Sequence, residues 1–461
     1  MCKEMRGSPK GHVVLFPFPA QGHTTPILQF AKRLASKGVK TTLATTVYVS
    51  KTMHIKNCNV GIETISDGFD ETGSFQAVDY FKSFEEVGSR TLTEIINKYS
   101  NDRSGECDYA PVTCLLCDSI IPWGLNVGKK LGLVTGIFYT QSCSVTSMFY
   151  HIKQGNLSVP VEKPTVSIPG LPLLANEDLP SCVSVLEGTT PSALSLLMGQ
   201  FANVENADWL LYNTFEELES EILNWMRELW QVRSIGPTTP SMYLDKRVEG
   251  DTENSFYMFK PSDATYIKWL NARENGSVLY ISFGSVATLD EEQMEELICG
   301  IKQSERDFIW VVREKEQSKL PANFAEEMLQ KGLVVPWCSQ VEVLAHEAVG
   351  CFLTHCGWNS TIEALGLGVP MVAMPNIWDQ PTNAKFVEDV WEIGVRVKPD
   401  DNGIVRRGEL ERCIREVMEG ESGKVFKANA SRWREAAKNA VGAGGSSDLN
   451  IDEFVLSITY P

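Results

Sequence analysis

The sequence predicts an α/β fold with doubly wound parallel sheets in two domains. Three observations support this prediction: the length of the chain, the alternation of strand-like and helix-like segments, and a break in that alternation near the middle. At 461 residues the chain exceeds the roughly 250 to 300 residues at which a single hydrophobic core stops growing. Its composition, with 43% hydrophobic and 22% charged residues, is that of an ordinary globular protein.

The first unit of the chain combines a strand, a helix and a second strand. Residues 13–18 form a short apolar run typical of a buried strand. Thr25-Pro26 then signals a helix start, Gly38 closes the helical spacing, and residues 39–46 predict the next strand. A crossover of this kind implies that the two strands are parallel.

The same alternation continues to about residue 230. We expect strands at 112–118, 133–140 and 209–214, with helical segments at 123–132 and 215–229. Alternating strands and helices are typical of a doubly wound sheet.

After about residue 237 the sequence loses any clear period and becomes rich in turn residues and charge. The alternation then restarts, with a capping box at Asp290 and Gln293 before a helix. Further strands are expected at 277–285, 308–313, 332–337, 350–355 and 369–375. We therefore predict a first domain at 1–240, a linker at 241–260, a second domain at 261–440, and a final helix at 441–461 that packs back on the first domain.

Charge and targeting signals exclude several function classes. The net charge of −17 argues against nucleic acid or an anionic membrane as partner, because phosphate backbones are bound through clustered Lys and Arg. No signal peptide and no membrane-spanning stretch is recognisable, so we expect a cytoplasmic protein.

The cysteines fit a reducing compartment rather than a disulfide scaffold. The twelve cysteines show no regular framework. Cys114 and Cys117 match a CxxC motif, but they lie in a predicted strand, where residues three apart face opposite ways and cannot share a metal ion. No cluster of residues has zinc-like spacing, so we expect no metal site.

Two residues at strand ends are candidates for acid–base chemistry. Ligands of doubly wound sheets bind beyond the carboxyl ends of the strands, where both His23 and Asp118 are expected. A histidine can accept a proton near neutral pH, and a buried carboxylate can fix its tautomer. The alternatives are a helix-capping or solvent-facing His23 and a strand-end cap at Asp118.

The stretch HCGWNSTIEAL at 355–365 is a candidate anion site. A strand there runs into a glycine turn and a helix start, whose unpaired N–H groups can bind phosphate without net positive charge. His355, Trp358, Asn359 and Ser360 can add donors. The alternative is a capping box in which Glu363 only satisfies a backbone N–H.

Other nucleotide and nucleophile motifs are absent from the sequence. The loop after the first strand reads FPFPAQGHTTP, which lacks the G-x-G-x-x-G fingerprint of dinucleotide enzymes. Neither a P-loop nor a G-x-S-x-G elbow occurs. A nucleotide-sugar epimerase or dehydrogenase is disfavoured for the same reason.

With these residues assembled, the chain resembles plant UDP-dependent glycosyltransferases of natural-product metabolism. The resemblance extends from FPFPAQGH to the tail, and residues 337–380 resemble the 44-residue donor signature of that family. It implies the GT-B fold, in which two Rossmann-like domains face each other. The first domain would bind mainly the acceptor, the second would bind the UDP-sugar, and the reaction would occur between them.

The resemblance also implies a role for each matching residue. His23 matches the catalytic base and Asp118 its partner. Trp337 matches the residue that stacks on uracil, and the backbone of Cys338 the group that pairs with its edge. The ribose contacts would be Gln340 and Glu363, and the diphosphate contacts His355, Asn359 and Ser360, with Ser285 nearby. The sugar contacts would be Trp358, Asp379, Gln380 and Thr140.

The implied activity is an inverting O-glucosyl transfer from UDP-glucose to a hydroxyl or carboxyl of a small lipophilic metabolite, such as a phenolic, a steroid or terpenoid, or an aromatic acid. UDP-glucose would be the co-substrate, with no further cofactor or metal, and we expect a monomer. A catalytically silent member that only binds a lipophilic ligand or UDP-sugar is the alternative.

The acceptor pocket is the least specific part of this prediction. We expect it to draw on Phe81, Phe84, Gln141, Met148, Phe201 and Trp378. The sequence departs from the family pattern at Thr24-Thr25, where an aliphatic-Asn pair is common, and at Ser339, where proline is common. Trp378 stands one position later than the family tryptophan. Gln380 resembles the residue of glucose users.

Overall fold

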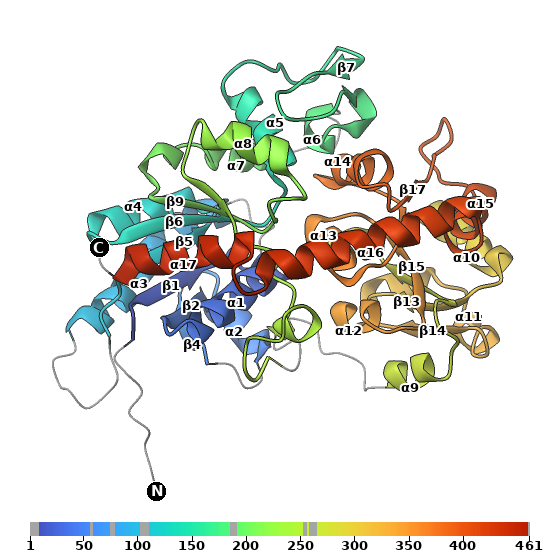
Figure 1. Ribbon diagram of the computed structural model, residues 1–461, viewed down its shortest axis with the longest axis horizontal. Coiled ribbons are helices and arrows are strands. Elements are labelled where there is room, and N and C mark those ends of the chain that lie inside the picture. Colours follow the sequence, from blue (N-terminus) through green and yellow to red (C-terminus); the bar gives the residue numbers. More distant parts are fainter. Residues whose placement is uncertain are drawn as a thin grey trace, which may run out of the picture.

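The computed structural model describes residues 9–55, 59–73, 79–101, 110–184, 191–251, 256–257 and 265–459. It contains two wholly parallel sheets, each with helices packed against it (Figure 1). The predicted architecture of two doubly wound, Rossmann-like α/β domains is confirmed. The residue boundaries of the domains stay a prediction.

The first sheet has seven strands in the order β10-β9-β6-β5-β1-β2-β4. Its strands are β1 (His12–Phe16), β2 (Lys40–Thr46), β4 (Gly61–Ile65), β5 (Cys114–Asp118), β6 (Val134–Tyr139), β9 (Trp209–Tyr212) and β10 (Val232–Ser234). The helices of this half are α1 (Gln21–Ser36), α2 (Val47–Thr52), α3 (Tyr80–Asn101), α4 (Pro122–Lys130), α5 (Cys143–Lys153), α6 (Ser181–Ser184), α7 (Pro191–Gly199) and α8 (Ser220–Arg227).

The second sheet has six strands in the order β14-β13-β12-β15-β16-β17. Its strands are β12 (Val278–Ser282), β13 (Asp307–Val311), β14 (Gly332–Val335), β15 (Val349–Thr354), β16 (Met371–Ala373) and β17 (Gly394–Arg396). The helices are α9 (Thr265–Asn271), α10 (Glu291–Ser304), α11 (Phe324–Glu327), α12 (Gln340–Leu344), α13 (Trp358–Leu367), α14 (Gln380–Lys385), α15 (Arg407–Met418), α16 (Glu421–Val441) and α17 (Ser446–Thr459).

Both faces of the first sheet are buried, as expected when crossover helices cover a parallel sheet. Along β1, Val13 and Leu15 pack into one apolar cluster, while Val14 and Phe16 pack into the cluster on the opposite face. Along β5, Cys114 and Cys117 likewise lie in different clusters. The described residues contain no group of three or more potential metal ligands.

All the strands predicted from apolar runs are present. The three strands of these sheets that were not predicted, β4, β10 and β17, each lie at the end of a sheet. Four of the five residues of β4 are at least partly exposed, so its sequence carries a weak apolar signal. Strands β10 and β17 have only three residues each, too few to show a clear apolar run.

The start of α1 differs from the sequence prediction, and the capping box predicted for α10 is only half formed. Helix α1 begins at Gln21, so Thr25-Pro26 lies inside the helix rather than at its start. Asp290 caps α10 as predicted by accepting the Gln293 N–H at 2.7 Å. The Gln293 side chain does not complete the capping box, because it bonds instead to the backbone of Val405.

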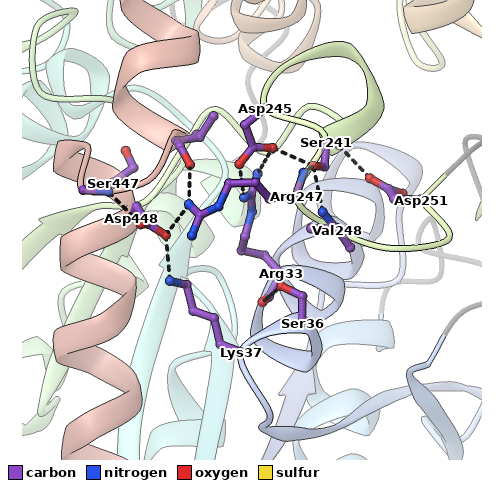
Figure 2. A network of polar contacts seen from close by, with 12 residues as sticks. Arg33, Ser36, Lys37, Ser241, Asp245, Arg247, Val248, Asp251, Ser447 and Asp448 are labelled. Carbon is purple, nitrogen blue, oxygen red and sulfur yellow. Dashed lines mark hydrogen bonds and ion pairs between the residues drawn. The ribbon is translucent and has the colours of Figure 1, made fainter.

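The chain segment after the first domain is tied to α1 by a buried polar network (Figure 2). Arg33 of α1 donates to both oxygens of Asp245, and Lys32 donates to Asp251 at 2.7 Å. Ser241 donates to Asp245 at 2.6 Å. The part of the predicted linker that the structure describes is therefore held against the first domain; residues 252–255 and 258–260 lie outside the described residues.

The C-terminal helices cross from one domain to the other. Helix α16 packs against α13 and α15 of the second domain, and α17 continues over the first (Figure 1). Ile451 and Phe454 of α17 join the apolar cluster of β1 and α1, and Lys37, the C-cap residue of α1, donates to Asp448 at 2.6 Å. Across the described ranges, no helix is long and apolar enough to cross a membrane.

Candidate active site

A cavity of about 430 Å³ lies where the carboxyl ends of the two sheets face each other. Its walls come from both domains: the β1–α1 turn, the loop after β6 and helix α7 on one side, and the loops after β12, β14, β15 and β16 on the other. This is the position at which doubly wound sheets bind their ligands.

His23 and Asp118 meet at the first-domain wall of this cavity. His23 is the third residue of α1, Asp118 is the last residue of β5, and the strands β1 and β5 are neighbours. His23 Nδ1 lies 2.7 Å from Asp118 Oδ2. The Asp118 carboxylate is buried and also accepts the backbone N–H groups of Phe18 and Ile120. His23 is not the N-cap of α1, which is Ala20.

This pairing sets the proton chemistry of His23. A carboxylate at Nδ1 accepts the Nδ1–H, which leaves the lone pair on Nε2, the nitrogen on the other side of the ring. Burial acts to lower the pKa of His23, but the charge and hydrogen bond of Asp118, with a further contribution from Asp379, outweigh it. The pKa is therefore raised above its usual 6.5.

The helix start opposite His23 has the geometry of an anion site. Helix α13 begins at Trp358 after Gly357, which makes no side-chain cap. The chain reaches this start through Cys356, whose φ of 62° is unusual for a residue with a Cβ. The alternative of a capping box does not hold, because Ser360 and Glu363 are the third and sixth residues of the helix and so cannot cap it. The N-cap residue therefore supplies no side-chain cap, and the first N–H of α13, that of Trp358, donates to the Asp379 carboxylate.

His355 lies beside that helix start in a slot formed by two glycines. A Cβ at either Gly284 or Gly357 would approach His355 Nε2 to 2.7 Å, so only glycine leaves room for the ring. Burial lowers the pKa of His355 to about 4, despite a backbone hydrogen bond to Ser282 that acts to raise it. The imidazole is thus neutral near pH 7, and its single N–H is the one that bonds to the Ser282 backbone.

Gln340, Ser360 and Glu363 form a polar group deeper in the second domain. Gln340 Nε2 lies 2.9 Å from Ser360 Oγ and donates to Glu363 Oε2 at 2.8 Å. Burial raises the pKa of Glu363 to about 7, and the hydrogen bond from Gln340 acts in the opposite direction. Trp337 and Cys338 line the same part of the cavity.

Asp379 and Gln380 face the cavity from the start of α14. Asn383 donates to Asp379 at 2.8 Å, but burial outweighs this bond and raises the pKa of Asp379. The side-chain oxygen Oε1 of Gln380 accepts the backbone N–H groups of Asn376 and Ile377, both at 2.9 Å. These bonds fix the loop that precedes the two side chains.

Two side chains of α13 bridge the domains at the cavity. Asn359 Nδ2 donates to the Gly22 carbonyl at 2.5 Å, and Trp358 Nε1 donates to the Asn213 carbonyl at 2.8 Å. The Gly22 carbonyl is available because Pro26, four residues later in α1, has no N–H to donate to it. A proline inside α1 thus leaves an acceptor for the second domain.

Comparison with known proteins identifies the family. Residues 212–436 match the family described as UDP-glucoronosyl and UDP-glucosyl transferase. Mogroside I-E synthase of Siraitia grosvenorii is 47% identical over 452 residues, which cover 96% of this chain and 97% of that protein. The chain belongs to the plant UDP-glycosyltransferases.

Further relatives of this glycosyltransferase support the same family. UDP-glycosyltransferase 74E2 of Arabidopsis thaliana is 47% identical over 459 residues, which cover 96% of this chain and 98% of that protein. The crystal structure of Os79 from O. sativa in complex with UDP has a TM-score of 0.90 at 39% identity, covering 97% of this chain and all of that one. The predicted GT-B fold is confirmed.

The cavity of this glycosyltransferase brings together His23, the predicted base, and the residues predicted to bind the donor. Its lining includes His23, Thr140, Ser285, Trp337, Cys338, Gln340, His355, Trp358, Asn359, Ser360, Glu363, Asp379 and Gln380. Asp118 lies behind His23. The contacts of these side chains with a bound nucleotide sugar stay a prediction.

The predicted acceptor residues divide into two groups. Gln141 and Trp378 line the cavity. Phe84, Met148 and Phe201 do not, because all three are buried in the core of the first domain. Phe81 does not line it either; its ring stacks on Phe18, which meets the His23 ring edge-on at 5.4 Å.

Several cavity residues were not predicted from the sequence. Gln21 lies two positions before His23 and Ser119 directly follows Asp118, so both belong to the strand-end segments where a ligand was expected. Phe149, Leu196 and Leu197 come from α5 and α7 and form an apolar wall. No local pattern distinguishes these three from core residues.

Proposed function

We propose that this enzyme transfers glucose from UDP-glucose to a hydroxyl or carboxyl oxygen of a small lipophilic acceptor, with inversion at the anomeric carbon. The observation that carries the proposal is the pair of His23 and the buried Asp118 at 2.7 Å, on the cavity wall that faces the helix start of α13.

His23 acts as the general base in this mechanism. Its Nε2 accepts the proton of the acceptor O–H while the oxygen attacks the anomeric carbon of the sugar. As the new C–O bond forms, the bond to the diphosphate breaks and UDP leaves with the electron pair. Attack from the side opposite the leaving group converts the α-linked donor into a β-glucoside. Asp118 stabilises the imidazolium that forms.

The second domain binds the donor and the leaving group. The remaining N–H groups of the first turn of α13 stabilise the negative charge that develops on UDP. Glu363 and Gln340 receive the ribose, and Asp379 and Gln380 the glucose hydroxyls. The mechanism needs no metal, since these donors supply the stabilisation themselves. Crystallisation of the relative Os79 with UDP supports UDP as the nucleotide.

The cavity also indicates the class of acceptor. The ring of Trp378 and the apolar wall of Phe149, Leu196 and Leu197 favour a small lipophilic molecule. Gln141 of the same lining can bind one polar group of that molecule.

The test is an acceptor screen with the purified protein and UDP-glucose. We expect a mass increase of one hexose on at least one phenolic, terpenoid, steroid or aromatic-acid acceptor, and a β-anomeric coupling in the NMR spectrum of the product. His23→Ala should reduce turnover by about 10²- to 10⁴-fold and leave the UDP Kd nearly unchanged. Transfer at the wild-type rate by His23→Ala would refute the base assignment. Binding of UDP without transfer to any acceptor would favour a silent, ligand-binding protein.

A further inference from the structure

The loop that carries the proposed sugar contacts has a strained backbone. Trp378, directly before Asp379 and Gln380, has a φ of 60°. This left-handed conformation is unfavourable for a residue with a Cβ, so it persists only where surrounding contacts enforce it. Conformations of this kind concentrate at functional sites.

Hydrogen bonds from both domains fix the conformation of this loop. Within the second domain, the Gln380 side chain accepts the N–H groups of Asn376 and Ile377. The next N–H, that of Trp378, donates to Ser181 Oγ of the first domain at 2.7 Å. In return the Ser181 N–H donates to the Trp378 carbonyl at 2.9 Å. Both backbone groups of the strained residue therefore bond to the other domain.

The segment before Ser181 is fixed to the second domain as well. The buried carboxylate of Asp178 pairs with Arg396 of β17 at 2.8 Å and with Lys385 of α14 at 3.5 Å. The Asp178 carbonyl also accepts the hydroxyl of Thr382 at 2.7 Å. In Figure 1, α6, which begins at Ser181, lies close to α14.

We propose that Ser181 is a positioning residue for the donor sugar. By bonding to both backbone groups of Trp378, it stabilises the left-handed turn from which Asp379 and Gln380 face the cavity. The sugar site is then complete only while the first domain contacts the second. This inference rests on the proposed function, because it takes the sugar of UDP-glucose to lie against Asp379 and Gln380.

The experiment compares the binding of UDP with that of UDP-glucose by calorimetry, because UDP lacks the sugar. Ser181→Ala removes the acceptor of the Trp378 N–H. We expect the Kd of UDP-glucose to rise about fivefold, the effect of losing one hydrogen bond, and the Kd of UDP to change by less than about twofold. Ser181→Thr keeps the hydroxyl and should restore the wild-type ratio of the two constants.

A second pair of variants tests whether backbone strain is the cause. Trp378→Ala and Trp378→Gly both remove the indole ring, but only glycine adopts the left-handed conformation freely. Adding Ser181→Ala should weaken UDP-glucose binding about fivefold in the Trp378→Ala background and less than about twofold in the Trp378→Gly background. Equal effects in the two backgrounds would overturn the proposal.

Ser36→Ala is the matched control. It removes a serine hydroxyl bond of the same 2.7 Å length at the end of α1, so it should leave both binding constants unchanged. A parallel loss of UDP and UDP-glucose binding in Ser181→Ala, or no loss at all, would overturn the positioning role. Failure of the wild-type protein to bind or transfer the glucose of UDP-glucose would instead overturn the proposed function.

Discussion

At the scale of single residues, the raised pKa of His23 makes the proposed base sensitive to pH. A base must be neutral, so kcat/KM should fall as the pH drops through the His23 pKa, which lies above 6.5. Asp118→Asn removes the charge that raises this pKa. In that variant we expect the acidic limb of the pH profile to move to lower pH. The plateau should fall by about 10²-fold or more, because the tautomer is no longer fixed.

The matched control is Asp208→Asn. It also removes a first-domain carboxylate that forms an ion pair, here with Lys129, but Asp208 lies outside the cavity lining. Its acidic limb should coincide with that of the wild-type enzyme. An unchanged limb in Asp118→Asn would show that His23 is not the group whose protonation limits the reaction.

The sequence predicted the contact between His23 and Asp118 but not which apolar side chains line the cavity. Asp118 ends β5 and His23 follows the neighbouring strand β1, and the topology of a parallel sheet brings such positions together. No such rule of sheet topology applies to the side chains of Phe84 and Met148. An apolar side chain has the same sequence pattern whether it faces the core or a cavity, so only packing decides between them.

At the scale of elements, the close packing of Gly284 and Gly357 around His355 lets us predict the effect of adding a methyl group at Gly284. Gly284→Ala combines a left-handed φ of 71° with a Cβ that would approach the His355 ring to 2.7 Å. We expect the UDP Kd, measured by calorimetry, to rise by about tenfold or more, because the displaced imidazole would crowd the start of α13, where the diphosphate is proposed to bind. Gly403→Ala is the control: its φ is 80°, but a Cβ there meets nothing within 4 Å.

Both alanine variants should be less stable than the wild-type protein, since each forces a left-handed conformation on a residue with a Cβ. Only Gly284→Ala should lose UDP affinity. Equal UDP affinity in the two variants would remove His355 from the proposed diphosphate site.

Helix starts were the elements that the sequence predicted least accurately. Pro26 signalled the first turn of a helix, but α1 begins at Gln21. The Gly22 carbonyl, which Pro26 leaves without an N–H, accepts the Asn359 side-chain N–H instead. At α13, Ser360 and Glu363 had the spacing of a capping box, yet the helix begins at Trp358. At α1 the deciding contact comes from a side chain of the second domain, and at α13 a turn at Cys356 precedes the helix. The local sequence signal indicates neither.

At the scale of the whole molecule, the two sheets were predictable and their connection was only partly so. Each sheet follows from the alternation of strands and helices, which is local information. The polar ties between domains, such as Arg396 with Asp178, join residues that are more than two hundred positions apart. Single charged residues give no indication of such distant partners, so these contacts emerge only from the folded structure.

The crossing helix α17 allows a test of how the ends of the chain are joined. Ile451 is buried in the cluster of the first domain, whereas Leu449 on the same helix is 57% exposed. Replacing either by alanine removes the same number of carbon atoms. Ile451→Ala should lower the free energy of unfolding by about 2 to 5 kcal/mol, and Leu449→Ala by less than about 0.5 kcal/mol.

Differential scanning calorimetry with and without UDP measures this difference. Because Ile451 packs on the first domain and the proposed UDP contacts lie in the second, Ile451→Ala should lower Tm while the UDP Kd changes by less than about twofold. Equal Tm values for the two variants would mean that α17 adds little to the first domain. A large loss of UDP affinity in Ile451→Ala would instead mean that docking of α17 shapes the donor site from a distance.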